Sequence, residues 1–203
     1  MRRLLFALLA VMMASPAAHA AVIRFDTNPL IGNAAETTPG RQVVGGEPSI
    51  VFDIAADVLE FDAAQFGVAN PLSFFNGLVA DLAPGGADIV VVQDTGAPFG
   101  AGNAANLIAA QVTTSAPGFF IYFNTNLQLA RLVYSPDLSE ATSDLAVLAR
   151  FTNIAGPEGF AAFPEIESDN FAVPEPTTLA LFGVAGLGLL RRRLRATAHR
   201  HRP

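Results

Sequence analysis

The chain contains no cysteine, no tryptophan and no lysine, and its three histidines lie near the two ends. Because disulfides need cysteine, we expect a fold that is held together mainly by side-chain packing. Between positions 21 and 172 there is also no histidine, so the usual nucleophile–base pairs of serine and cysteine hydrolases are excluded there. Zinc, which prefers histidine and cysteine ligands, is disfavoured for the same reason.

Positive charge is scarce in the middle of the chain. Between positions 21 and 172 there are 17 aspartate and glutamate residues but only four arginines. Such an acidic domain repels the phosphate backbone, so we expect no nucleic-acid partner. Apolar residues still make up 51% of the chain, which argues against a disordered polypeptide. The segment between the two ends, about 150 residues, is long enough for one domain with a core.

The first 20 residues have the pattern of a secretory signal peptide. A positively charged start precedes an apolar stretch, Leu4 to Ala14, which is too short to span a membrane comfortably. Small residues at Ala18 and Ala20 predict cleavage before Ala21 by signal peptidase, after export by the Sec machinery. We therefore assign residues 1–20 to a signal helix that is absent from the mature protein.

The segment 173–196 has three parts in a fixed order. A stiff, proline-flanked motif opens it: Val173, Pro174, Glu175 and Pro176. An apolar stretch, Thr177 to Leu190, follows, and as a transmembrane helix it spans about 21 Å against roughly 30 Å of hydrocarbon. A basic cluster then stops the helix on the cytoplasmic side, before a polar tail at 197–203. This cluster consists of Arg191, Arg192, Arg193 and Arg195.

This arrangement resembles the PEP-CTERM sorting signal, which is also labelled an ice-binding protein C-terminal domain. The resemblance implies that an exosortase recognises Pro174, Glu175 and Pro176, cleaves near them and passes the protein to the cell surface. It also implies a Gram-negative bacterium that makes exopolysaccharide, with the precursor anchored in the inner membrane before processing. The alternative is a plain tail anchor, in which the proline-flanked motif is only a linker.

Residues 21–172 are predicted to form a mainly β domain. Their apolar runs are short and are separated by Gly, Pro, Asn and Asp, which favours strands over long helices. The β-branched run at 87–92 is typical of a buried strand, and 119–123 with 127–134 predicts a hairpin. Together with further strands, this pattern predicts a single antiparallel β-sandwich, jelly-roll-like. These further strands are expected at 22–25, 49–54, 58–61, 145–151 and 170–173.

Two details of this domain are also predicted. In 145–151 the apolar residues Leu145, Val147, Ala149 and Phe151 recur with a period of two, which puts them on one face of the sheet. One short helix is expected at 103–112 with Asn103 as its cap, and a second helical turn at 62–66.

Acidic residues are the remaining candidates for a binding or catalytic site. Hard carboxylate oxygens suit Ca²⁺, so a structural calcium ion is the one cofactor we consider. Carboxylate pairs such as Asp53 with Asp57, or Glu60 with Asp62, have the chemistry of a glycosidase. Acids at this density form such pairs by chance, so we expect no enzymatic activity. The calcium candidates are Asp94, Glu165, Glu167 and Asp169.

The sequence therefore predicts an exported, exosortase-sorted surface protein with a structural or adhesive role in the exopolysaccharide or biofilm matrix. Its expected partners are exosortase, signal peptidase, the Sec machinery and exopolysaccharide. The first alternative is a carbohydrate-binding module, for which Tyr122 and Tyr134 are the aromatic candidates, although both positions favour the core. The second alternative is a carboxylate-dependent glycosidase.

Overall fold

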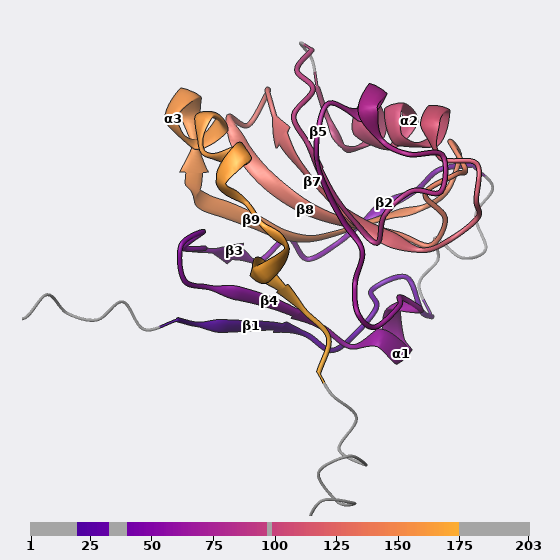
Figure 1. Cartoon of the computed structure of the whole chain (residues 1–203), viewed down its shortest axis with the longest axis horizontal. Helices are drawn as coiled ribbons and strands as arrows, with labels where there is room; N and C mark the ends of the chain where they lie inside the picture. The colour runs from indigo at the N-terminus through magenta and orange to yellow at the C-terminus, as the bar shows by residue number, and fades with distance from the viewer. Residues whose placement is uncertain (1–19, 33–39, 97–98, 175–203) are drawn as a thin grey trace, which may run out of the picture.

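The computed structural model describes residues 20–32, 40–96 and 99–174, and two β-sheets that lie one above the other form most of it (Figure 1). The smaller sheet has three strands in the order β1–β4–β10. These strands are β1 (Val22–Phe25), β4 (Val58–Phe61) and β10 (Phe171–Ala172).

The larger sheet has seven strands in the order β2–β9–β8–β7–β6–β5, and β3 also pairs with β9. Its strands are β2 (Val43–Val44), β3 (Ser49–Ile50), β5 (Phe74–Gly77), β6 (Ile89–Val92), β7 (Gly118–Asn124), β8 (Leu129–Ser135) and β9 (Leu145–Ala155).

The helices are short. Asp62 caps α1, because its side chain accepts hydrogen bonds from the backbone of Ala64 and Gln65. Asn103 lies inside α2 rather than at its cap, and its side chain accepts a bond from the backbone N–H of Gly100. No helix of the described residues is long and apolar enough to cross a membrane. The helices are α1 (Ala63–Phe66), α2 (Ala101–Gln111), α3 (Gly156–Ala161), and the 3₁₀ turns η2 (Val79–Asp81), η3 (Phe163–Glu165) and η4 (Ser168–Asn170).

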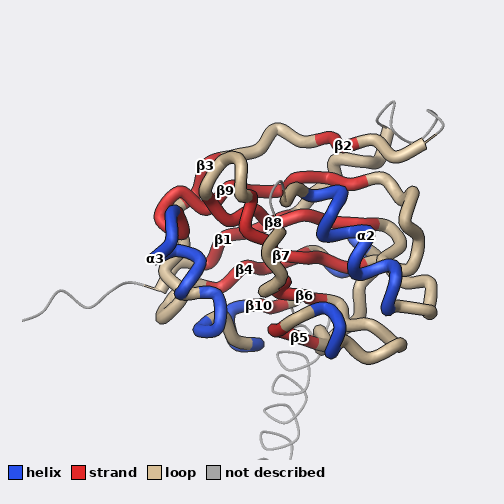
Figure 2. The backbone as a smooth tube through the Cα atoms, turned by 90° about the horizontal axis from the view of Figure 1, so that it is seen from above, coloured by secondary structure: helices blue, strands red, loops and turns tan. Residues whose placement is uncertain are grey.

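The larger sheet is apolar on both faces, because each face is covered. One face packs against the smaller sheet, where the rings of Phe61 and Phe119 stack with centroids 4.0 Å apart. The other face, which includes Val90 and Phe120, packs under Ile108 of α2. Seen from above, α2 lies across the strands of this sheet (Figure 2). The domain therefore has three layers: small sheet, large sheet and helix.

The prediction of a mainly β domain is confirmed, but the predicted antiparallel pairing is wrong. Six of the eight strand pairs in the described residues are parallel, and only β7–β8 and β8–β9 are antiparallel. The physical reason lies in α2, which connects β6 to its parallel neighbour β7 as a crossover helix. A strand covered on both faces is apolar throughout, as Ile89–Val92 is.

The predicted common face of 145–151 is also wrong, because β9 contains a bulge. Val147 and Ala149 pair with consecutive residues of β8, so Leu148 between them is an extra residue. The faces exchange at this point. Val147 packs on the helix side of the sheet, whereas Ala149 packs toward the smaller sheet.

Candidate functional site at the two processing ends

The smaller sheet carries both ends of the described domain. β1 begins directly after Ala21, the first residue behind the predicted signal-peptide cut, and β10 ends directly before the proline-flanked motif. Both strands flank β4 and run parallel to it, with Val22 opposite Val58 and Phe171 opposite Leu59 (Figure 1). Because all three strands are parallel, the chain enters this sheet at one end and leaves it at the other.

Ala21 is hydrogen-bonded into the sheet at the N-terminal end. Its backbone N–H donates to Oδ1 of Asp57 at 2.8 Å, and its carbonyl accepts from the N–H of Val58 at 2.9 Å. The other carboxylate oxygen of Asp57 accepts from the N–H of Asp53 at 2.9 Å. Asp57 is only 7% exposed. Backbone N–H groups therefore satisfy both oxygens of a carboxylate that water hardly reaches.

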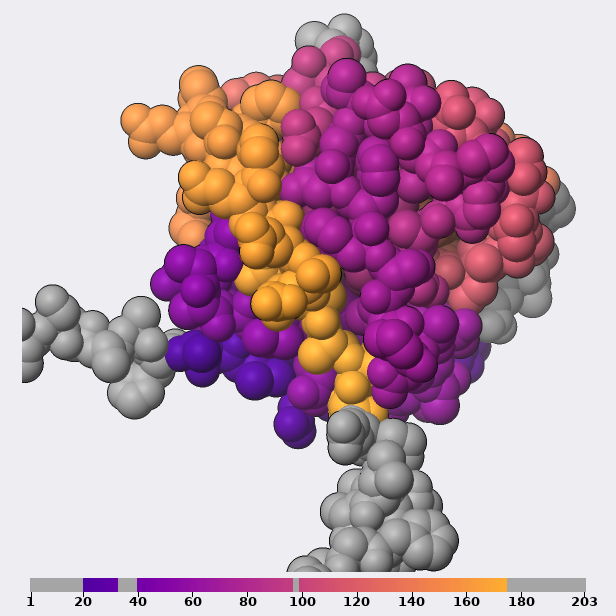
Figure 3. Space-filling model, in the orientation of Figure 1, coloured from indigo at the N-terminus to yellow at the C-terminus, as the bar shows by residue number. Residues whose placement is uncertain are grey.

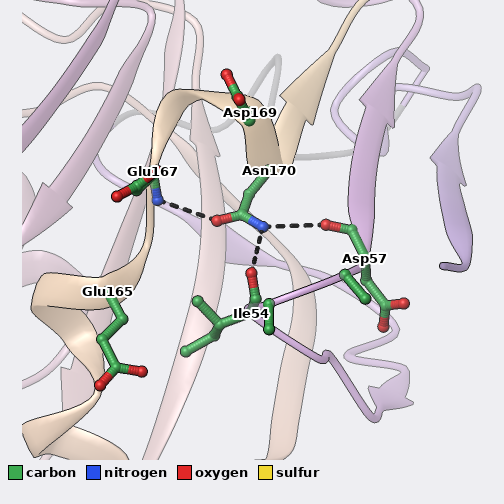
Figure 4. Close-up of a pocket in the computed structure, with 8 residues that line it drawn as sticks. Ile54, Asp57, Glu165, Glu167, Asp169 and Asn170 are labelled. Carbon is green, nitrogen blue, oxygen red and sulfur yellow. Dashed lines mark hydrogen bonds between the residues drawn. The ribbon is translucent and has the colours of Figure 1, made fainter. Parts of the chain in front are cut away.

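Asn170 fixes the C-terminal end. Its Nδ2 donates to the carbonyls of Ile54 and Asp57 at 2.8 and 3.1 Å (Figure 4). Its Oδ1 accepts from the N–H of Glu167 at 3.0 Å, and the residue is 6% exposed. The side chain thereby joins the C-terminal segment to the turn that precedes β4.

The chain stays attached to the domain up to the start of the motif. The ring of Phe171 packs against Phe74 with centroids 5.6 Å apart. Val173 is half-buried against the core, and Pro174 is exposed. The segment from α3 to β10 lies on the surface as a continuous orange-to-yellow band, and β10 at its end pairs with β4 (Figure 3). The folded domain therefore continues into the motif without an intervening linker.

An acidic cleft of about 430 Å³ lies between the turn at 54–57 and the segment 165–170. Glu165, Glu167 and Asp169 all line it, but their carboxylates point in different directions (Figure 4). Within the described ranges, no three His, Cys, Asp or Glu side chains come close enough to hold a metal ion.

A family model of the PEP-CTERM protein-sorting motif matches residues 172–195. The chain carries a PEP-CTERM sorting motif. This motif implies an exported protein whose precursor is sorted through a C-terminal membrane anchor, with exosortase as the processing partner. No curated protein and no solved structure matches the chain.

The PEP-CTERM motif begins inside the folded domain, since its first matched residue, Ala172, is the last residue of β10. Val173 and Pro174 are the other matched residues that the structure describes. The rest of the predicted motif and stop, Glu175, Pro176, Arg191, Arg192, Arg193 and Arg195, lies outside the described residues, as does Ala18. Ala20, which precedes the predicted cut, is exposed.

The predicted calcium ligands do not form one site. Asp94 lies apart from the cleft, and its Oδ2 accepts a hydrogen bond from the backbone N–H of Val79 at 2.7 Å. The other three candidates share the cleft without converging on a common point. Calcium binding therefore stays a prediction of the sequence.

The carboxylate pairs have structural contacts. Asp57 accepts hydrogen bonds from backbone N–H groups, Asp62 caps α1, and Glu60 forms an ion pair with Nε of Arg24 at 2.8 Å. Another acidic residue, Glu47, forms ion pairs with both Arg131 and Arg150, which are cross-strand neighbours. Asp57, Glu60 and Asp62 therefore each have a structural contact in the described fold.

The two tyrosines are core residues. Tyr122 is fully buried and Tyr134 is 3% exposed, so neither presents a ring face to a sugar. The hydroxyl of Tyr134 donates to the carbonyl of Phe66 at 2.9 Å. Burial raises the pKa of Tyr134, although a hydrogen bond with Asn28 opposes this change. The hydroxyl of Tyr122 accepts a bond from Arg131.

Proposed function

We propose that this protein is an exosortase substrate that is exported, cleaved before Ala21, anchored in the inner membrane and then delivered to the surface of a Gram-negative bacterium. The observation that supports the proposal is the PEP-CTERM motif at 172–195, which follows the last strand of a folded domain. In this proposal the protein is what exosortase acts on, and it has no catalytic activity of its own.

We further propose a structural or adhesive role for the domain in the exopolysaccharide or biofilm matrix. Its strong acidity suits a hydrated, crowded matrix in which the protein must stay soluble. The exposed large hydrophobic side chains of the described residues are all aliphatic. A role as a carbohydrate-binding module through stacked aromatic rings therefore has less support than a structural one.

Replacing Glu175 with alanine in the natural host tests the sorting step. Exosortase recognition of the motif predicts that the Glu175→Ala protein keeps its C-terminal segment and stays in the membrane fraction. The wild-type protein is expected in the surface or released fraction with a smaller mass. Cell fractionation followed by intact-mass measurement reports both properties.

Glu165→Ala is the matched control, because it removes the same charge from an exposed position ten residues earlier. It is expected to be processed like the wild type. Normal release of Glu175→Ala would contradict recognition of the motif by exosortase. For the matrix role, a strain that retains the Glu175→Ala protein in its membrane should form a less cohesive biofilm than the control strain.

A further inference from the structure

We infer that signal-peptide removal converts the contact between Ala21 and Asp57 from a hydrogen bond between a neutral amide and a carboxylate into an ion pair, so that the cleaved protein is more stable than its precursor. This inference rests on the cleavage before Ala21 that the proposed function includes. Hydrolysis of the Ala20–Ala21 peptide bond consumes one water, leaves a carboxylate on Ala20 and leaves a protonated amine on Ala21.

Cleavage creates the new amine beside a carboxylate that is already in place. In the uncleaved chain, the Ala21 nitrogen lies 2.8 Å from Oδ1 of Asp57, within the range of a charge-assisted hydrogen bond. Before cleavage this nitrogen is a neutral amide, and after cleavage it carries a full positive charge at neutral pH. The distance needs no rearrangement, because Ala20 is exposed and its removal leaves no gap in the core.

Both partners are held in place by other groups. The carbonyl of Ala21 accepts from the N–H of Val58, which places Ala21 at the start of the smaller sheet. The N–H of Asp57 donates to the carbonyl of Asp53 at 2.7 Å, and the carbonyl of Asp57 accepts from Asn170. The ion pair therefore forms between groups that lose little further freedom, which favours a net gain in stability.

The excess of negative charge around Asp57 also favours an ion pair with the new amine. Asp57 belongs to the lining of the acidic cleft, together with Glu165, Glu167 and Asp169, and no arginine lines that cleft. None of the ion pairs between described side chains involves Asp57. The ammonium of the mature N-terminus is thus the cation that this part of the surface lacks.

The expected gain is modest. The contact already joins a neutral amide to a carboxylate, so cleavage adds only the attraction of the new positive charge. Solvent screens part of this attraction because Ala21 is exposed. We expect the folding equilibrium constant of the cleaved chain to exceed that of a chain with a blocked amine about fivefold.

The absence of lysine makes a clean experiment available. In the mature protein the α-amino group is the only primary amine, so acetylation with an acetyl ester of N-hydroxysuccinimide blocks it selectively. Mature protein is purified from the host, its N-terminal residue is established by intact mass, and urea unfolding is measured with and without acetylation. The acetylated protein is expected to have an about fivefold smaller folding constant.

Asp57→Asn supplies the matched comparison. In this variant the ion pair is absent, so acetylation should leave the folding constant unchanged. Asp169→Asn removes a charge from the same cleft without touching Ala21, and it should keep the full response to acetylation. Equal folding constants for the wild-type protein with and without acetylation overturn the inference, as does an equal response to acetylation in Asp57→Asn.

A second measurement needs no variant, in case Asp57→Asn does not fold. A paired ammonium gives up its proton less readily, so the wild-type amine should be acetylated more slowly in the folded protein than in urea. Equal rates overturn the inference. A mature chain that still contains residues 1–20, or that begins elsewhere, counts instead against the cleavage in the proposed function.

Discussion

Asn170 is a single amide side chain that satisfies backbone groups of Ile54, Asp57 and Glu167. It is 6% exposed, so water cannot replace these bonds easily. Asn170→Ala is expected to lower the free energy of unfolding by about 2–3 kcal/mol, because two carbonyls and one N–H lose their partner. Urea denaturation of the mature protein measures this change.

Asp169→Ala is the control for this prediction, since Asp169 is the exposed neighbour. Its free energy of unfolding should stay within about 0.5 kcal/mol of the wild-type value. A comparable loss in both variants would mean that the turn, rather than the amide of Asn170, holds the segment in place.

Asp137 is expected to make the stability of the domain depend on pH. Burial works to raise the pKa of Asp137, but hydrogen bonds from Ser115 and Ser139 outweigh burial and hold the pKa below its ordinary value. A lowered folded-state pKa stabilises the fold above the unfolded-state pKa of about 3.9, and this contribution is lost as the pH falls through the folded-state pKa.

Ser115→Ala is therefore expected to destabilise the protein at pH 7 by less than about 1 kcal/mol, because solvent still reaches the half-buried carboxylate of Asp137 and screens its charge. The difference from wild type should shrink as the pH is lowered below about 3.9. Urea unfolding at a series of pH values tests this, with Ser168→Ala as the control at another serine beside an aspartate. A difference that grows in acid would contradict the assigned role of Asp137.

Among the elements, α2 has one side buried against the larger sheet and one side exposed. Ala104, Ala105, Ile108 and Val112 are buried against the larger sheet, whereas Leu107 is 38% exposed. Ile108→Ala is expected to cost about 2–4 kcal/mol of unfolding free energy, because it leaves a cavity in a fully buried site.

Leu107→Ala removes a side chain of the same size from the exposed side of α2. It should cost less than about 1 kcal/mol. Thermal or urea unfolding of the two variants compares the faces directly. Equal losses would place Leu107 in the core after all.

The elements that the sequence predicts correctly are those with local causes. The hairpin β7–β8 follows from two apolar runs around an Asn-rich turn, and α1 follows from the capping position of Asp62. β2 and β5 were missed, because such short strands are defined by their neighbours in the sheet. Strand direction was missed for a related reason: a strand's own pattern does not reveal which neighbour it joins.

In the candidate site, too, residues with a local sequence signal could be predicted, whereas contacts between distant parts of the chain could not. Ala21 and Pro174 are predicted from sequence alone, since cleavage and sorting patterns are local. The contacts of Asp57 could not be predicted, because its partners Ala21 and Asn170 lie 36 and 113 residues away along the chain. No local signal distinguishes Asp57 from the other acidic residues, so only the fold shows that it links both ends.

For the whole molecule, the smaller sheet places the two proposed cleavage regions near its opposite ends, since β1 begins after Ala21 and β10 ends before the motif. β10 ends at Ala172, and the predicted membrane segment begins at Thr177. Five residues span at most about 18 Å, so in the proposed precursor the domain is expected to lie close to the membrane surface until sorting takes place. In this proposal, exosortase binds a motif with little free chain between it and the folded domain.

This geometry predicts which products of sorting stay folded. A chain that ends at Pro174 keeps Asn170 and β10, and it should unfold at the same urea concentration as the natural mature protein. A chain that ends at Asp169 loses the Asn170 hydrogen bonds and the packing of Phe171 on Phe74. It should be less stable by about 3–5 kcal/mol.

Urea unfolding of the two truncated chains tests this, and backbone amide exchange in β4 supplies a local readout, because β10 pairs with β4. Equal stability would show that β10 lies outside the cooperative fold. If the shorter chain is destabilised as expected, a cut before Asn170 would release a domain with an open sheet edge. The sorted protein should then retain residues at least through Ala172, and its intact mass reports this directly.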